Sequence, residues 1–396
     1  MCRFLVYKGA KPIVLSKLVT EPAHSILTQS YDSRLRLDRR RPVNGDGFGL
    51  GWYTDVELGY DPCIFTSTIP AWNCSNLERL AKKVQSRLVF AHVRATTEGS
   101  LAEDNCHPFQ HNTIMFMHNG NVGAWKYVKR RISDFLDDRW YMQIRGGTDS
   151  EMCFALFLHM LAQEGVDPSA TPYQGFGAKK LRKAMVKTIA KINELIKSST
   201  CTNAELTEVD TRSLLNFAVT DGHSVVITRY VSSKTDEAAS LYYSSGTDWV
   251  DEGSYQFVME RRDKASDVIL VASEPLTFER HNWLPVPTNT IVTIEGQTVS
   301  VVPIKDEYFD PNPIADRNTS FAKQKGLISK QPGGPTLVPS GVATPQPDNS
   351  TNGISHRGQH WSISGTIEDF KYKVDNLALT APRTSNHSNR ASSLQA

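Results

Sequence analysis

The order of strand and helix signals along the chain is the sequence feature that most restricts its fold. Short runs rich in aromatic and β-branched residues come first, and similar runs return from residue 214 onward. The early runs are residues 2–7, 48–54, 87–93 and 113–120. Two helical patterns lie between the two groups of strands. Strands on both sides of a central pair of helices predict an α+β layered fold with a mostly antiparallel sheet.

The two helical patterns differ in character. The first helix is predicted to begin near Thr148, because Thr148 and Glu151 fit a capping box and apolar residues follow at helical spacing. The second is predicted over 178–198, where one apolar stripe runs along a basic helix. The stripe consists of Leu181, Met185, Ile189, Ile192 and Ile196. Packing on the sheet is the simplest interpretation, and binding to a membrane surface is the alternative.

The composition argues against several classes of protein. The 396 residues include 44 basic and 42 acidic side chains, so the net charge gives no argument for a nucleic-acid partner. No apolar run is long enough to span a membrane, and the first residues lack the apolar core of a signal peptide. The six cysteines form no C-x-x-C pair. Reduced thiols and a cytoplasmic location are therefore expected.

The composition changes near residue 310. Residues 310–396 are rich in Pro, Ser, Thr and Asn and contain few large apolar side chains, so they are predicted to form a disordered tail. One island in this tail, IEDFKYKVDNLAL at 367–379, is interpreted either as a chance cluster or as a short partner-docking motif. The folded part is predicted to lie within residues 2–305.

Residues 44–53, NGDGFGLGWY, carry glycines at alternate positions. The spacing breaks the dinucleotide-binding fingerprint, which also needs a helix where this sequence continues as a strand. Alternating glycines clear one face of a strand, so that another backbone or a ligand can approach closely. The preceding stretch 33–42 contains five arginines. A solvated loop is the first interpretation of this stretch, and the rim of a site for an anionic substrate is the alternative.

Four polar motifs stand at predicted strand ends and helix starts, where side chains converge. They are AHVRATTEG (91–99), NCHPF (105–109), MHNGN (117–121) and GGTDSE (146–151). A metal site is one interpretation, because five side chains are of ligand type: His92, Cys106, His107, His111 and His118. Their spacing matches no standard zinc pattern, so no metal is predicted. His92 and His118 are interpreted as structural histidines.

Cys2 suggests a different chemistry. Methionine is commonly removed before a small second residue, and Cys2 would then carry a free amine beside its thiol. An N-terminal amine ordinarily has a pKa of about 7.7–8.0, so it can act as general base toward the thiol without a histidine. Attack of the thiol on a side-chain amide would form a thioester and release ammonia or an amine.

Taken in order, these motifs resemble a known family. The chain resembles the glutaminase domain of class II glutamine amidotransferases, which are N-terminal nucleophile hydrolases. The motifs that carry the resemblance are Cys2 with its strand, NGDGFGLGWY, HVRATT, HPF, HNGN and GTDSE. The late stretches VASEPLT (271–277) and NTIVTI are similar to a stand-alone branch that includes the fungal DUG-pathway subunit for glutathione degradation. The resemblance implies a four-layer αββα sandwich of two antiparallel sheets, with the domain at 2–305 and the tail at 310–396.

The resemblance also implies the roles of the catalytic residues. Cys2 would be the nucleophile and its freed amine the base. The side-chain amide of Asn119 and the backbone N–H of Gly120 would form the oxyanion hole, which agrees with a tight turn that presents donors.

Four further residues are implied to hold the substrate. Arg94 would bind the α-carboxylate with its planar fork, and Asp149 would pair with the α-ammonium, so that together they select a free γ-glutamyl group. Thr97 and His107 would contact or support the substrate. Two of these residues also have a simpler interpretation. Arg94 could be a partner in a surface ion pair, and Asp149 could be a charge that stabilises a helix N-terminus.

One motif departs from the family pattern, because the common Arg-Trp-Ala-Thr-His run appears here as Arg-Ala-Thr-Thr-Glu at 94–98. The loss of the Trp and the His suggests a wider pocket or a weaker selectivity for glutamine. The expected function is cleavage of glutathione to glutamate and Cys-Gly together with a peptidase-like partner subunit, without a cofactor, nucleic acid or membrane. The alternatives are a glutaminase subunit that supplies ammonia to a partner synthase, and a non-catalytic scaffold.

Overall fold

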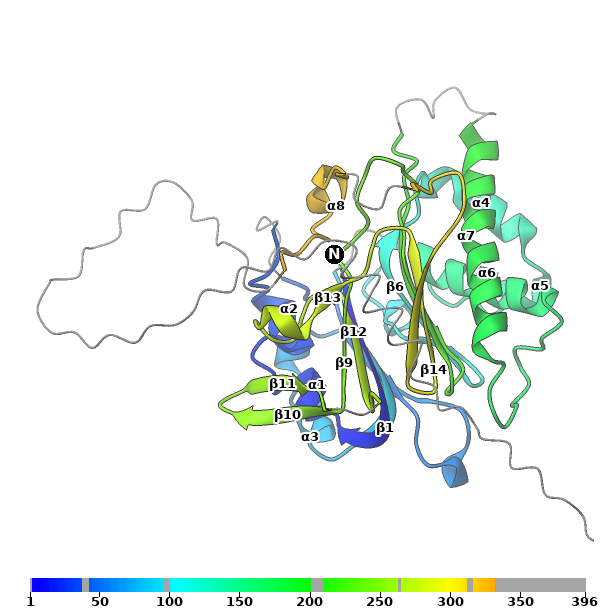
Figure 1. Cartoon of the computed structure of the whole chain (residues 1–396). Helices are drawn as coiled ribbons and strands as arrows, with labels where there is room; N and C mark the ends of the chain where they lie inside the picture. Colours follow the sequence, from blue (N-terminus) through cyan, green and yellow to red (C-terminus); the bar gives the residue numbers. More distant parts are fainter. Residues whose placement is uncertain are drawn as a thin grey trace, which may run out of the picture. The chain divides into compact units, whose positions relative to one another are not determined.

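The computed structural model describes residues 2–37, 43–95, 100–200, 209–262, 265–311 and 316–331 (Figure 1). Three predicted features lie wholly or partly outside these ranges. They are Thr97, predicted to contact the substrate, residues 38–42 of the arginine-rich stretch, and the part of the predicted tail from residue 332 onward, with the island at 367–379.

The first sheet is antiparallel and has seven strands in the order β13-β9-β12-β1-β4-β2-β3. In chain order these are β1 (Arg3–Val14), β2 (Phe48–Trp52), β3 (Cys63–Ser67), β4 (Gln85–Val93), β9 (Tyr242–Gly246), β12 (Val268–Ala272) and β13 (Leu284–Pro285). The first strand of the chain lies in the middle, where Leu5 pairs with Ala91 of β4 on one side and with Ala272 of β12 on the other.

The second sheet is also antiparallel and has six strands in the order β15-β14-β8-β7-β6-β5. They are β5 (Phe109–His111), β6 (Ile114–Asn121), β7 (Leu214–Thr220), β8 (Val225–Arg229), β14 (Thr290–Glu295) and β15 (Thr298–Pro303). A separate two-stranded ribbon consists of β10 (Asp248–Gly253) and β11 (Gln256–Glu260).

The two sheets pack face to face over a shared apolar layer. Phe4 and Val6 of β1 face Met115 and Met117 of β6 in this layer, and all four side chains are buried. The alternate residues of β1, among them Leu5, point to the opposite face and join the core beneath the helices. This alternation is what a strand buried on both faces requires.

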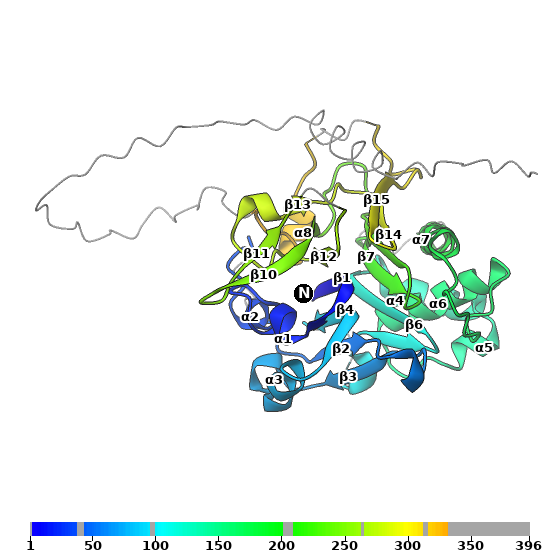
Figure 2. The same ribbon diagram turned by 60° about the horizontal axis from the view of Figure 1, so that its bottom comes forward.

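Helices cover the outer face of each sheet. α4 (Trp125–Phe135), α6 (Asp149–Gln163) and α7 (Ala178–Thr200) pack on the second sheet, and α6 and α7 lie beyond β6 and β7 on the side away from β1 (Figure 2). α1 (Ser16–Val19), α2 (Ile26–Tyr31) and α3 (Ser75–Ala81) cover the first sheet. The arrangement is the predicted αββα sandwich. The short elements are α5 (Asp138–Tyr141), α8 (Ser320–Gln324), and 3-10 turns at Val56–Leu58, Ala71–Asn73, Glu103–Asn105 and Arg280–Asn282.

Both predicted helices are present. α6 begins at Asp149, and the Thr148 hydroxyl accepts the Glu151 amide at 3.3 Å as an N-cap. All five stripe residues of the second helix belong to the core that α7 shares with the second sheet, so the apolar stripe is covered by protein. Within the described ranges, no helix is long and apolar enough to cross a membrane.

Residues 316–331, here called the C-terminal segment, pack against the sandwich although they follow the predicted domain boundary at residue 305. Phe321 and Leu327 are buried in a small apolar cluster with Leu214 and Ala238. The segment also exchanges backbone hydrogen bonds with the loop after α2, where the Leu37 amide donates to Ile328 and the Lys330 amide donates to Leu35.

We expect Ile189→Ala to lower the free energy of unfolding by about 2–5 kcal/mol, because it leaves a cavity where α7 packs on the sheet. Lys180→Ala, on the exposed face of the same helix, is the control and should change it by less than about 0.5 kcal/mol. Urea unfolding measures both. Equal, small effects of the two substitutions would contradict this packing.

Candidate functional site

The predicted site residues come from three strand ends and one helix start. Cys2 stands at the beginning of β1, and Arg94 follows β4, which pairs with β1 so that Arg3 lies opposite Val93. Asn119 and Gly120 lie at the end of β6, paired with Asn216 and Leu215 of β7, so the tight turn expected at these two residues is wrong. Asp149 is the first residue of α6. The fold therefore gathers residues that lie up to 147 positions apart in the chain.

Cys2 is a free, half-buried cysteine. Its Sγ lies 3.8 Å from the carbonyl oxygen of Ala95, directly after Arg94. Its own carbonyl accepts a hydrogen bond of 2.9 Å from the Arg3 guanidinium. A thiol that is partly exposed and free of a disulfide can act as a nucleophile.

Asn119 connects the second sheet to β1. Its side-chain Nδ2 donates to the Ser273 hydroxyl at 3.0 Å, and that hydroxyl also accepts the Phe4 amide at 3.0 Å. An amide nitrogen has two hydrogens, so one remains for a developing oxyanion. Asn119 Oδ1 has no hydrogen-bond partner among the described residues.

Gly120 is required by a close approach of two backbones. A Cβ at this position would lie 1.7 Å from the carbonyl oxygen of Leu214, at the start of the neighbouring strand β7. No side chain fits there unless β6 or β7 moves. Glycine therefore keeps the end of β6, and with it Asn119, tightly against β7.

Arg94 is almost completely buried at the edge of the glycine strand. Its amide donates to the Gly47 carbonyl at 2.8 Å, and its Nη1 donates to the Ser100 carbonyl at 3.3 Å. The glycines of that strand serve close packing, because a Cβ at Gly49 would lie 2.1 Å from the His107 carbonyl oxygen. The structure thus supports the packing interpretation of this glycine pattern.

Asp149 is held in place by one backbone donor and one side-chain donor. Its Oδ2 accepts the Val122 amide at 2.8 Å and its Oδ1 accepts the Ser150 hydroxyl at 3.2 Å. The N-terminus of α6 also favours a carboxylate at this position. Because Val122 follows Gly120 by two residues, the carboxylate lies close to the end of β6. Asp149 can therefore stabilise the N-terminus of α6 and also contact a substrate, so the two interpretations are compatible.

Three buried histidines lie beneath these residues. The His107 ring lies between a tilted His92 ring and an edge-on Phe109 ring, with ring centroids 4.1 Å and 4.5 Å away. Burial lowers the pKa of all three, well below the ordinary value for His107 and to about 3 for His92. They are neutral near pH 7, and His118 donates from Nε2 to the Leu214 carbonyl at 3.0 Å. His92 and His118 thus have the structural surroundings predicted for them.

His107 is enclosed rather than presented to solvent. Neither ring nitrogen has a hydrogen-bond partner among the described residues. The expected contact with a substrate therefore stays a prediction. In the described part of the chain, no group of three His, Cys, Asp or Glu side chains could hold a metal ion.

Two residues at this site, Ser273 and Arg3, were not predicted from the sequence. Ser273 bridges Asn119 and β1, and it lies in the VASEPLT stretch that was noted only as a similarity. Arg3 binds the Cys2 carbonyl. A charged residue inside an otherwise apolar strand was the available signal for Arg3.

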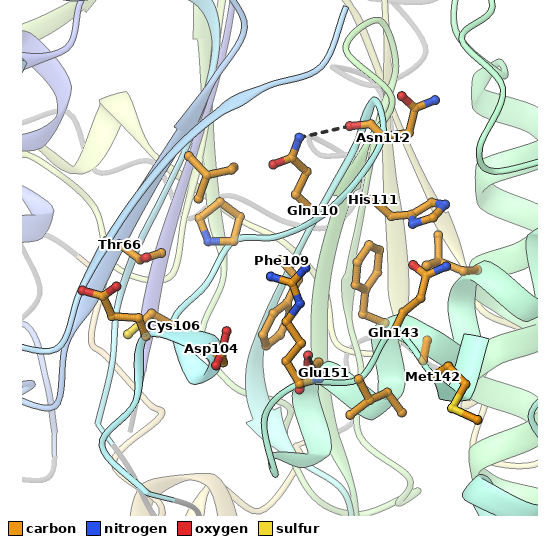
Figure 3. A pocket seen from close by; sticks show the side chains of 18 residues that line it. Thr66, Asp104, Cys106, Phe109, Gln110, His111, Asn112, Met142, Gln143 and Glu151 are labelled. Atoms are coloured by element: carbon orange, nitrogen blue, oxygen red, sulfur yellow. Dashed lines mark hydrogen bonds between the residues drawn. The ribbon is translucent and has the colours of Figure 1, made fainter. Parts of the chain in front are cut away.

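A separate cavity of 550 Å³ opens between β3, β5 and α6 (Figure 3). Thr66 and Cys106 lie at one side of it, and Phe109, Gln143 and Glu151 at the other. None of Cys2, Arg94, Asn119 and Asp149 belongs to its lining. The cavity is therefore distinct from the cluster of predicted site residues.

Comparison with known proteins identifies relatives over most of the chain. Residues 28–313 match the family model of class II glutamine amidotransferases. The chain is 52% identical over 334 residues to a Saccharomyces cerevisiae protein named "Probable glutamine amidotransferase DUG3", covering 84% of this chain and 92% of that protein. It is 24% identical to the gamma-glutamyl-hercynylcysteine sulfoxide hydrolase of Mycolicibacterium smegmatis, covering 77% of this chain and 100% of that protein.

A solved structure of a glutamine aminotransferase class-II domain protein from Silicibacter pomeroyi aligns with a TM-score of 0.47 and 22% identity, covering 76% of this chain and 98% of that one.

We expect the free energy of unfolding to fall as the pH is lowered from 6.5 to 5.5. Burial depresses the pKa of His92, His107 and His118, so over this range the unfolded chain binds protons that the folded chain does not. Each such histidine should contribute a loss of about 1 kcal/mol. Urea midpoints at the two pH values measure the effect. His92→Gln should reduce the pH dependence and His223→Gln, at an exposed position, should not; an unchanged midpoint in the wild type would contradict the expectation.

Gly120→Ala should lower the free energy of unfolding by about 1–3 kcal/mol, because its Cβ would overlap the Leu214 carbonyl oxygen. Gly147→Ala is the matched control, since a Cβ there would meet nothing within 4 Å. Thermal or urea unfolding compares the two. A Gly120→Ala variant as stable as the control would show that β6 and β7 do not approach this closely.

Proposed function

The chain belongs to the class II glutamine amidotransferases and is an enzyme that acts on γ-glutamyl amides, and we propose that it cleaves glutathione to glutamate and Cys-Gly through a thioester on Cys2. The observation that carries the proposal is that Cys2 lies against the backbone directly after Arg94, while Asn119 reaches from the second sheet to Ser273, which also binds the Phe4 amide of β1. Asp149 binds the Val122 amide, directly after the strand that carries Asn119. One relative supports the choice of substrate class, because its name describes a γ-glutamyl derivative of a modified cysteine.

In the proposed reaction the Cys2 thiol loses its proton to the chain's own α-amine and the sulfur attacks the γ-carbonyl carbon of the substrate. The carbonyl oxygen becomes an oxyanion, stabilised by Asn119 Nδ2 and the Gly120 N–H. When the intermediate collapses, the C–N bond breaks and the leaving nitrogen takes up the proton. Water then attacks the thioester carbonyl, which releases glutamate and restores the thiol.

Two charged residues would select the γ-glutamyl end. Arg94 is buried, so a carboxylate that reaches its guanidinium would form a pair shielded from water, where such pairs discriminate strongly. Asp149 would accept from the α-ammonium while keeping its bond to Val122. We assign supporting contacts to Thr97 and His107, as the family resemblance implies.

Glutamine is the second candidate substrate, because the family takes its name from it. Hydrolysis of glutamine would release ammonia for a partner synthase by the same steps. For the glutathione reaction we propose a peptidase-like partner subunit. We also propose the cytoplasm as the compartment, and the cysteines of the described ranges support it because they are free thiols.

Cys2→Ala should lower the release of glutamate by about 10³-fold or more, because no other group replaces the attacking sulfur. The assay offers glutathione and glutamine separately to the purified protein, alone and with a co-purified partner. Cys63→Ala, which removes an exposed free thiol, is the control and should retain full activity.

Three outcomes decide between the proposals. Full activity of Cys2→Ala would show that the nucleophile is wrong, and Met1 retained on an active protein would show that the base is wrong. A kcat/KM for glutamine far above that for glutathione would favour the glutaminase reaction over glutathione cleavage.

A further inference from the structure

The residue after the proposed nucleophile is a buried arginine that binds Glu274, Cys2 and Gly326 among the described residues. Arg3 is 1% exposed. Its Nε binds a carboxylate oxygen of Glu274, its Nη1 donates to the Cys2 carbonyl at 2.9 Å, and its Nη2 donates to the Gly326 carbonyl at 2.9 Å. Since the guanidinium is planar and rigid, fixing any two of these contacts fixes the position of the third.

Glu274 is held firmly enough to orient the guanidinium. It is completely buried, and the Ser33 hydroxyl lies 2.7 Å and 2.6 Å from its two carboxylate oxygens. Burial raises its pKa, but Arg3, His24, the Ser33 hydroxyl and Arg36 together outweigh burial and hold the pKa below its ordinary value. The carboxylate therefore stays ionised, as a buried ion pair requires.

The third partner belongs to the C-terminal segment, residues 316–331, which lies 323 positions away from Arg3 at Gly326. The segment is fixed on both sides of Gly326. Phe321 packs under the Arg212 guanidinium, whose centre lies 3.9 Å from the ring centroid. The Leu327 carbonyl accepts the Ser240 amide at 2.7 Å, and the Leu327 side chain is buried.

We propose that Arg3 is a positioning residue that ties the C-terminal segment and Glu274 to the backbone of Cys2 and so fixes the place of the attacking sulfur. The inference rests on the proposed role of Cys2. A nucleophile at the very start of a strand is attached to the fold from one side only. The hydrogen bond from Arg3 to the Cys2 carbonyl supplies a second attachment. The Arg3 side chain is in turn held by the C-terminal segment, which lies outside the two sheets.

The first test is Arg3→Lys in the full chain, assayed on the substrate that gives the higher activity with the wild type. Lysine can keep the charge opposite Glu274, but its single ammonium cannot replace the planar fork. We expect kcat to fall about tenfold or more, with KM within threefold and the thermal midpoint within a few degrees. Arg130→Lys, at an exposed arginine of α4, is the matched control and should leave kcat unchanged.

A second variant tests the proposal if Arg3→Lys does not fold. Arg3→Met combined with Glu274→Leu removes both charges, which buried ion pairs tolerate far better than the loss of one partner. It should also lower kcat while the near-ultraviolet circular dichroism stays native. Wild-type kcat in either folded variant would overturn the proposal.

The link to the C-terminal segment has its own readout. Leu327→Ala should loosen the segment and lower kcat in the wild type, but should lower it no further when Arg3 is already lysine, because both changes break the same connection. Independent, additive effects would overturn the link. Inactive Cys2→Ala together with unaffected Arg3 variants would contradict this inference alone, whereas active Cys2→Ala would contradict the proposed function itself.

Discussion

The pairing of β1 with β4 and β12 is the interaction on which the rest of the structure depends. A strand at the chain start is free to lie at a sheet edge, yet here it fills the middle of the seven-stranded sheet and is bonded on both sides. Its position brings Cys2 beside Arg94 through β4. It also brings Phe4 beside Ser273, which lies directly after β12 and reaches across to Asn119 in the other sheet. One strand thus sets the distance between the two halves of the site.

The site is held mainly by polar contacts of completely or nearly buried groups. Glu274, Arg3, Asn119 and Arg94 are all removed from water, and each has at least one directed partner. A buried polar network destabilises the fold unless all of its donors and acceptors have hydrogen-bond partners. When they do, the side chains have few alternative conformations. Rigidity of this kind is what the proposed nucleophile and the proposed oxyanion hole, which lie on different sheets, would need in order to stay aligned.

The sequence alone predicted the features that depend on local pattern. The strand predicted at 87–93 is observed as Gln85–Val93, the helix predicted near Thr148 begins at Asp149, and the stripe of the second helix packs as expected. The capping box was right only in part. Thr148 caps the helix, but the Glu151 carboxylate accepts the amides of Arg145 and Gly146 instead of reaching back to Thr148.

Other features could not be predicted because they depend on contacts between distant segments. The strand predicted at 2–7 continues to Val14 through Lys11 and Pro12, since β4 offers a partner again after a register shift. The C-terminal segment packs against apolar side chains that lie between residues 214 and 239. No local sequence pattern in the segment predicts this contact. The contacts of Arg3 with Glu274 and Gly326 likewise link segments about 270 and 323 residues apart.

That last separation has a consequence for the order of events during synthesis. Because the ribosome makes a chain from its N-terminus onward, Arg3 is made 323 residues before Gly326. The buried hydrogen bond between them can form only after Gly326 has been made. Until then, the surroundings of Arg3 and of the Cys2 carbonyl that it binds are incomplete.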